Sequence, residues 1–79
     1  NASCAISFSL PEAGDVTIDI HDISGRRIAT LESGELDAGT HSVRWDGRDD
    51  SGAAMPGGIY LCRMKSGSFS ATTRLLLVK

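Results

Sequence analysis

Apolar and polar side chains alternate with a period of two along most of this chain, and this alternation constrains its fold more than any other feature. Extended backbone points successive side chains to opposite faces, so such runs predict half-buried β-strands. No segment keeps a helical period of 3.6 residues over three turns. The alternating runs cover residues 5–10, 15–22, 28–31, 40–45, 58–65 and 69–78. Six to seven short antiparallel strands with glycine-rich turns between them predict an all-β sandwich.

The segments between the runs predict how the strands connect. Residues 11–14 (PEAG) form a four-residue turn that joins the first two runs into a hairpin. Ser24 and Gly25 mark a second turn, and residues 32–39 (ESGELDAG) are expected to be a loop. The last two runs are close in the sequence, so we expect them to be neighbours in one sheet.

Length, composition and charge limit the classes of protein that this chain can belong to. With 79 residues it holds one domain, and 41% hydrophobic residues are enough for a core. The formal net charge of −2 and the scattered basic residues argue against nucleic-acid binding. No apolar run approaches the roughly 20 residues of a membrane-spanning helix. We interpret Asn1 and Ala2 as the remnant of a cleaved tag, which leaves residues 3–79 as the domain.

The stretch RWDGRDDSG, residues 44–52, resembles a calcium-binding loop at first sight. Such a loop needs oxygen ligands at positions 1, 3, 5 and 12. Counting from Asp46 places Arg48 at position 3, and counting from Asp49 places Ala53 at position 5. Asp46, Asp49 and Asp50 are therefore weak metal candidates. A turn that Asp46 closes by accepting backbone N–H groups is the preferred interpretation, with Trp45 anchoring the strand end in the core.

Other residues with reactive side chains give weaker signals. Asp19 and His21 share the outward face of one run, but two ligands without a third suit solvated strand residues better than a metal site. His41 has inward parity and is interpreted as a structural histidine. We therefore expect no enzyme activity and no cofactor. Glycan binding is not expected either, because all four aromatic residues have inward parity. They are Phe8, Trp45, Tyr60 and Phe69.

The two cysteines, Cys4 and Cys62, both have inward parity. They can form a disulfide if their strands lie in opposite sheets at one height, and otherwise they are two buried free thiols. The height of each residue in the sandwich does not follow from the sequence, so both alternatives stay open.

Several short motifs occur in a characteristic order from Ile6 to Lys79. They are ISFSLPEAGDVTIDIHDISGRRIATL, LDAGTHSVRWDGRDDSG, PGGIYLCRM and TTRLLLVK. In this order and spacing the chain resembles the immunoglobulin-like and fibronectin-III-like β-sandwich found at the C-termini of many secreted bacterial proteins. That group includes the C-terminal sorting domains of type IX (Por) secretion and the similar Ig-like domain of the flagellar hook-capping protein.

The resemblance implies a non-catalytic targeting or interaction module of a secreted or cell-surface protein. In this interpretation it directs a passenger across the outer membrane, and the outer-membrane secretion machinery is a partner. The sorting residues that the resemblance implies are Gly58, Tyr60, Leu75, Leu76, Leu77, Val78 and Lys79. The alternative is a structural spacer that packs against an upstream hydrolase, or part of a hook-capping-type scaffold.

The residues themselves predict an interaction patch. If the last two runs are adjacent, their outward faces bring together the apolar side chains of Ile59, Leu61, Leu76 and Val78. Arg63 and Arg74 flank them. Exposed apolar patches on a sheet often mark contact surfaces. We expect an upstream domain of the same protein or the secretion machinery to dock there, without insertion into a membrane.

Overall fold

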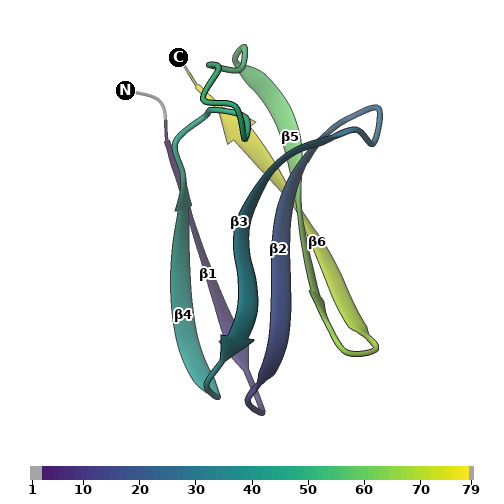
Figure 1. Cartoon of the computed structure of the whole chain (residues 1–79). Helices are drawn as coiled ribbons and strands as arrows, with labels where there is room; N and C mark the ends of the chain where they lie inside the picture. The colour runs from purple at the N-terminus through teal and green to yellow at the C-terminus, as the bar shows by residue number, and fades with distance from the viewer. Residues whose placement is uncertain (1–2, 79) are drawn as a thin grey trace.

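A computed structural model describes residues 3–78 of the chain as a sandwich of two antiparallel sheets (Figure 1). Its strands are β1 (Cys4–Leu10), β2 (Gly14–Asp22), β3 (Arg27–Leu36), β4 (Gly39–Trp45), β5 (Gly58–Ser66) and β6 (Phe69–Leu77). One sheet pairs β1 with β4, and the other has the order β3-β2-β5-β6. The predicted all-β sandwich is confirmed. No helix long and apolar enough to cross a membrane occurs among the described residues.

The core lies between the two sheets and follows the alternation. Along β2 every second side chain is buried, and Val16, Ile18 and Ile20 are at most 1% exposed. From the facing sheet, Trp45 at the end of β4 packs its ring against Tyr60 of β5 in an edge-to-face arrangement, with centroids 4.9 Å apart. The other buried members of the core are Leu10, Ile28, Ala29, Cys62 and Leu77.

The predicted hairpin of the first two runs is wrong. β1 pairs with β4, with Ile6 opposite Val43, whereas β2 pairs with β3 and β5. Residues 11–13 carry the chain from one sheet to the other instead of folding it back in the same sheet. Two strands that each have one apolar face can bury those faces by opposing each other across a sandwich, and that arrangement produces the same alternation as a hairpin.

The strand at 28–31 is longer than predicted, and most of the expected loop at 32–39 belongs to it. β3 continues to Leu36, and its second half pairs with residues 14–18 of β2. Two register shifts in this pairing explain the irregular pattern, since Ile28 and Ala29 are consecutive and both buried. The polar second half suits an edge strand with one solvated face.

The lower half of β6 lies outside the core. Its inward-parity residues Phe69, Ala71 and Thr73 are exposed, and Phe69 keeps 55% of its surface accessible. Two strands cover a sheet of four, and the β5–β6 hairpin diverges from β1 and β4 at its lower end (Figure 1). The prediction that all four aromatic rings are in the core is therefore wrong for Phe69. Phe8 is half-buried, and Trp45 and Tyr60 are buried.

Candidate functional site

The acidic loop between β4 and β5 contains a tight turn closed by Asp49. Its Oδ1 accepts hydrogen bonds from the Ser51 amide at 3.0 Å, the Ser51 hydroxyl at 2.7 Å and the Ala53 amide at 2.9 Å. Gly52 sits at a φ of 92°, a conformation that favours glycine. The Ser51 hydroxyl and then the Ala53 amide hold the pKa of Asp49 below its ordinary value.

The turn between β2 and β3 has the same construction. Oδ1 of Asp22 accepts from the Ser24 amide at 3.0 Å, the Ser24 hydroxyl at 2.6 Å and the Arg26 amide at 2.9 Å. Gly25 has a φ of 94°. The Ser24 hydroxyl and then the Arg26 amide lower the pKa of Asp22. The signal for both turns is the repeated pattern Asp-x-Ser-Gly at residues 22–25 and 49–52, which our sequence analysis missed.

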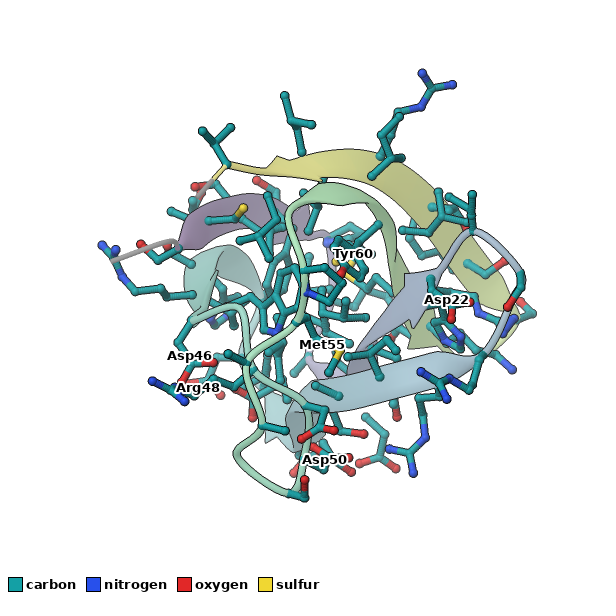
Figure 2. All side chains as sticks on the ribbon, turned by 90° about the horizontal axis from the view of Figure 1, so that it is seen from above. Asp22, Asp46, Arg48, Asp50, Met55 and Tyr60 are labelled. Atoms are coloured by element: carbon teal, nitrogen blue, oxygen red, sulfur yellow. The ribbon has the colours of Figure 1, made fainter. Side chains whose placement is uncertain are left out.

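The other two carboxylates of the acidic loop also serve the protein's own donors. Oδ1 of Asp46 accepts from the Arg48 amide at 3.1 Å, as predicted for a turn. Asp50 points to β3, where its Oδ1 accepts from the Thr30 amide and its Oδ2 from the Arg27 guanidinium, both at 3.1 Å. Figure 2 shows Asp46 and Asp50 on different parts of the loop. Among residues 3–78 no three His, Cys, Asp or Glu side chains gather as a metal site would require.

Bonds to Trp45 and Tyr60 fasten this loop to the core. Nε1 of Trp45 donates to the carbonyl of Arg48 at 2.9 Å, and the Tyr60 hydroxyl donates to the carbonyl of Pro56 at 2.6 Å. Met55 packs partly buried against the core between these two points (Figure 2). The loop therefore covers one end of the sandwich and is held there by these two hydrogen bonds. Its polar groups serve to form the turns of the loop.

The residues that the resemblance gave as a sorting motif divide into core and surface. Gly58 begins β5 with a φ of 149°, and Tyr60 holds the loop. Leu75 is half-buried and Leu77 is 2% exposed, so both contribute to the core. Leu76 and Val78 are exposed. Lys79 lies outside the described residues.

The pair Asp19 and His21 is less solvated than predicted. Their side chains are 17% and 12% exposed, and Nε2 of His21 lies 3.9 Å from Oδ2 of Asp19. Oδ1 of Asp19 accepts from the Thr30 hydroxyl at 3.0 Å, and Nδ1 of His21 faces the carbonyl of Gly25 at 3.3 Å. These bonds tie β2 to β3 and its turn. His41 is a structural histidine as predicted, because its Nε2 bonds the Asp37 carbonyl at 2.6 Å and its ring stacks on Phe8.

The two cysteines are free thiols, so the disulfide alternative is not realised in this structure. Their strands lie in opposite sheets, but the residues differ in height. Cys4 places its Sγ 3.6 Å from the carbonyl of Leu76, whose register partner on β5 is Ile59. Cys62 lies three residues further along β5, which is roughly 10 Å. Burial, and then the charge of Asp19, raises the pKa of the Cys62 thiol.

The outer face of β5 and β6 carries the predicted patch. The two strands are adjacent as expected, and Ile59 lies opposite Leu76. Ile59, Leu76 and Val78 are 45%, 63% and 69% exposed, and Leu61 is half-buried. Arg74 lies opposite Leu61 in the register. The apolar surface is thus at the end of the sheet where β5 begins and β6 ends (Figure 1). Arg63 and Arg74 lie further along the two strands, away from this end.

The architecture defines a small immunoglobulin-like β-sandwich domain, and sequence comparison assigns its family. The profile of the FlgD Ig-like domain matches residues 1–69, so the chain belongs to the FlgD Ig-like domain family. It is 48% identical over 48 residues to the basal-body rod modification protein FlgD of Salmonella typhimurium and 44% identical over 52 residues to that of Escherichia coli. These matches span 61% and 65% of the chain but only 21% and 22% of the relatives.

Two solved structures of FlgD have the same fold. The P. aeruginosa protein superimposes with a TM-score of 0.75 at 29% identity, over 95% of this chain and 59% of that one. The Xanthomonas campestris protein, whose structure is described as giving insights into hook capping, superimposes with a TM-score of 0.74 at 27% identity, over 96% of this chain and 56% of that one.

These findings correct the functional interpretation made from the sequence. The type IX sorting function is wrong, because the matching family and the similar proteins are all FlgD. The hook-capping branch of the resemblance, which was the alternative, agrees with them. The short motifs are common to both branches, so they define the fold and not the role.

Proposed function

We propose that this domain is a structural module of a flagellar hook-capping-type protein, with no catalytic role. The observation that supports this most directly is the match to the FlgD Ig-like domain over residues 1–69, together with a superposition on FlgD over 95% of the chain. The Xanthomonas campestris structure relates FlgD to hook capping in flagellar assembly.

The chemistry of the side chains supports a scaffold role. The carboxylates of the acidic loop bond to the loop itself or to β3, which rigidifies one end of the sandwich. The aromatic pair Trp45 and Tyr60 is buried and holds the same loop. What the domain presents to its surroundings is the outer face of β5 and β6, with its exposed apolar side chains. This surface is suited to contact with neighbouring protein, which includes other parts of the same polypeptide.

A chimaera tests the proposal. The segment of Salmonella typhimurium FlgD that is equivalent to the whole of this chain, and therefore longer than the 48 matched residues, is replaced by this chain, and the hybrid is expressed in a strain lacking FlgD. We expect flagellar assembly, scored by electron microscopy and swimming, to recover to a measurable fraction of the level with intact FlgD. FlgD with the segment deleted is the matched negative control. A hybrid that accumulates as a folded protein and yet supports no assembly would overturn the proposal.

A further inference from the structure

The two sheets differ in width, and the difference leaves one side of the sandwich open. Two strands at about 4.8 Å spacing cover about half the width of a four-stranded sheet. At the upper end β1 reaches β6, because Sγ of Cys4 lies 3.6 Å from the carbonyl of Leu76. Towards the lower end the two strands diverge (Figure 1). The wedge-shaped space between them is called the β1–β6 opening below.

Cavities and uncovered side chains follow this opening. A cavity of about 60 Å³ lies midway, between Ile6 and Phe8 of β1 and Ala71 and Thr73 of β6. A larger cavity of about 530 Å³ lies at the lower end, between the turn that follows β1 and the turn that precedes β6, with Phe69 in its wall. Ile6 and Phe8 are half-buried, and the three residues of β6 are exposed although they have inward parity. The inner face of the large sheet is therefore uncovered along this side.

The edge of β1 that faces the opening has unpaired backbone groups. In an antiparallel pair, the N–H and C=O groups of alternate residues point away from the partner strand. β1 pairs with β4 on its other side, and within residues 3–78 no backbone hydrogen bond joins β1 to another strand or to a loop. An extended strand supplies the N–H and C=O groups that match such an edge.

Sheet edges are normally shielded against pairing, and the edges of this domain differ in that respect. β3 has two register shifts and the charged residues Arg27, Glu32 and Glu35. The acidic loop also docks on β3 through the bond from the Thr30 amide to Asp50. β1 has none of these features, since its seven residues are uncharged, contain no proline and pair with β4 without a register shift. β1 therefore has the properties of a strand that a neighbour covers.

We propose that an extended segment of the same polypeptide, from outside residues 1–79, adds to the free edge of β1 as an antiparallel strand. The small sheet then has three strands, and the added strand closes the β1–β6 opening. FlgD relatives contain further polypeptide, because this chain covers 59% and 56% of the two solved structures and 21% and 22% of the curated relatives. The proposal does not depend on the hook-capping role, since it follows from the open edge.

The opening specifies the chemistry of the added segment. Beside residues 6–10 it needs about five or six residues, which span about 17–20 Å when extended. Alternate side chains face Phe69 and Ala71 and are apolar, and the others face solvent and are polar. Antiparallel pairing places the N-terminal end of the segment at the lower end. Glu12 and Asp15 line the cavity there, and no lysine or arginine within residues 3–78 does, so a basic residue is favoured at that end.

A second copy of the domain does not fit this position. If β1 of another copy paired antiparallel with β1, the four-stranded sheets of both copies would lie on the same side of the joined small sheets. Each large sheet extends beyond its own β1 at the lower end, where Phe69 and Ala71 are exposed. The two β5–β6 hairpins would therefore occupy the same space. A single added strand has no such overhang.

The accessibility of residue 71 is the first measurement. Ala71→Cys is made in a Cys4→Ser background, in the 79-residue chain and in the full natural polypeptide, and thiol labelling is followed by mass spectrometry of the peptide that contains residue 71. We expect labelling to be at least about tenfold slower in the full polypeptide, because the added strand covers this side chain. Ser70→Cys, on the outer face of the same strand, is the matched control and is labelled at equal rates. Equal rates at residue 71, or the same slowing at residue 70, overturn the proposal.

Hydrogen exchange of the β1 amides tests the pairing itself. The amides that point away from β4 are expected to exchange rapidly in the 79-residue chain and at least about tenfold more slowly in the full polypeptide. The amides of β2, which pairs with a strand on each side, are the internal reference. Protection that appears in the 79-residue chain only as its concentration rises would mean a second copy. Protection that requires a different polypeptide would mean an external partner, and either result overturns the proposal.

A blocking variant tests the position of the added strand. In the 79-residue chain the side chain of Ala71→Arg extends into solvent, so we expect the melting temperature to change by less than about 2 °C. In the full polypeptide the same arginine occupies the opening, displaces the added strand and restores rapid exchange of the β1 amides. Ser70→Arg is the matched control and leaves the protection in place. Protection that survives Ala71→Arg contradicts the proposal.

Discussion

At the scale of single residues, two aspartates determine the geometry of two turns. In each, one carboxylate oxygen accepts the hydroxyl and amide of the serine two residues on and the amide four residues on. A glycine then takes the positive φ that the turn needs. An Asp-x-Ser-Gly pattern therefore closes a turn through hydrogen bonds from the chain's own amides and hydroxyl.

We expect the double variant Asp22→Ala and Asp49→Ala to lower the melting temperature at pH 7. Both pKa values are below the ordinary value, so the carboxylates stabilise the fold above the unfolded pKa of about 3.9. This contribution is lost as pH falls through the lower folded values. The difference in melting temperature between the double variant and the wild type, measured by thermal unfolding from pH 7 to pH 2, should therefore become smaller as the pH falls. Asp37→Ala, whose carboxylate accepts no hydrogen bond in the described structure, should leave the profile unchanged, and a gap independent of pH would contradict the assignment.

At the scale of elements, β6 is a core strand only in its upper half. Leu77 is 2% exposed, whereas Phe69, at the other end and with the same parity, is 55% exposed. We expect Leu77→Ala to destabilise the domain by about 2–5 kcal/mol and Phe69→Ala by less than about 1 kcal/mol. Urea unfolding of both variants checks this. Equal losses would mean that the lower end of the sandwich is closed in solution.

The acidic loop is an element that protects the edge of β3. The carboxylate of Asp50 accepts hydrogen bonds from the Thr30 amide and the Arg27 guanidinium. The amide of Asp50 donates to the carbonyl of Ile28 at 3.2 Å. We expect Asp50→Ala to cost about 1 kcal/mol and to speed hydrogen exchange of the Thr30 amide, with β5 and β6 unaffected. Asp46→Ala, which frees only the Arg48 amide, is the matched control. Unchanged exchange at Thr30 would show that the loop does not dock on β3 in solution.

At the scale of the whole molecule, one core joins both sheets. Trp45 of the small sheet contacts Tyr60 of the large one, so its fluorescence reports on the separation of the sheets. We expect fluorescence and far-UV circular dichroism to show a single coincident thermal transition. From 79 residues, the unfolding enthalpy should be roughly 55 kcal/mol near 60 °C. Two separate transitions would mean that β1 and β4 detach before the large sheet unfolds.

The sequence by itself determined the fold class, the face of most strands and the turn nature of the acidic loop. These follow from local rules, because the period of two and the hydrogen-bonding range of an aspartate operate within a few residues. It also predicted the adjacency of β5 and β6, which a short turn joins. The same local signals left the role open, since motifs that specify a sandwich recur in domains with different functions.

Only the tertiary structure decided which strands pair when a short turn does not join them. β1 pairs with β4, about thirty residues away in the sequence. The local pattern does not predict this, because every alternating strand has the same backbone hydrogen-bonding groups and one apolar face. The pattern therefore does not distinguish a neighbour in the same sheet from a strand on the other side of the core. The tertiary structure also decided that Phe69 is exposed. Its exposure depends on how much of the four-stranded sheet is covered by the two-stranded sheet of β1 and β4. The difference in height between Cys4 and Cys62 likewise depends on strand order and register, which are set by the packing of the whole chain.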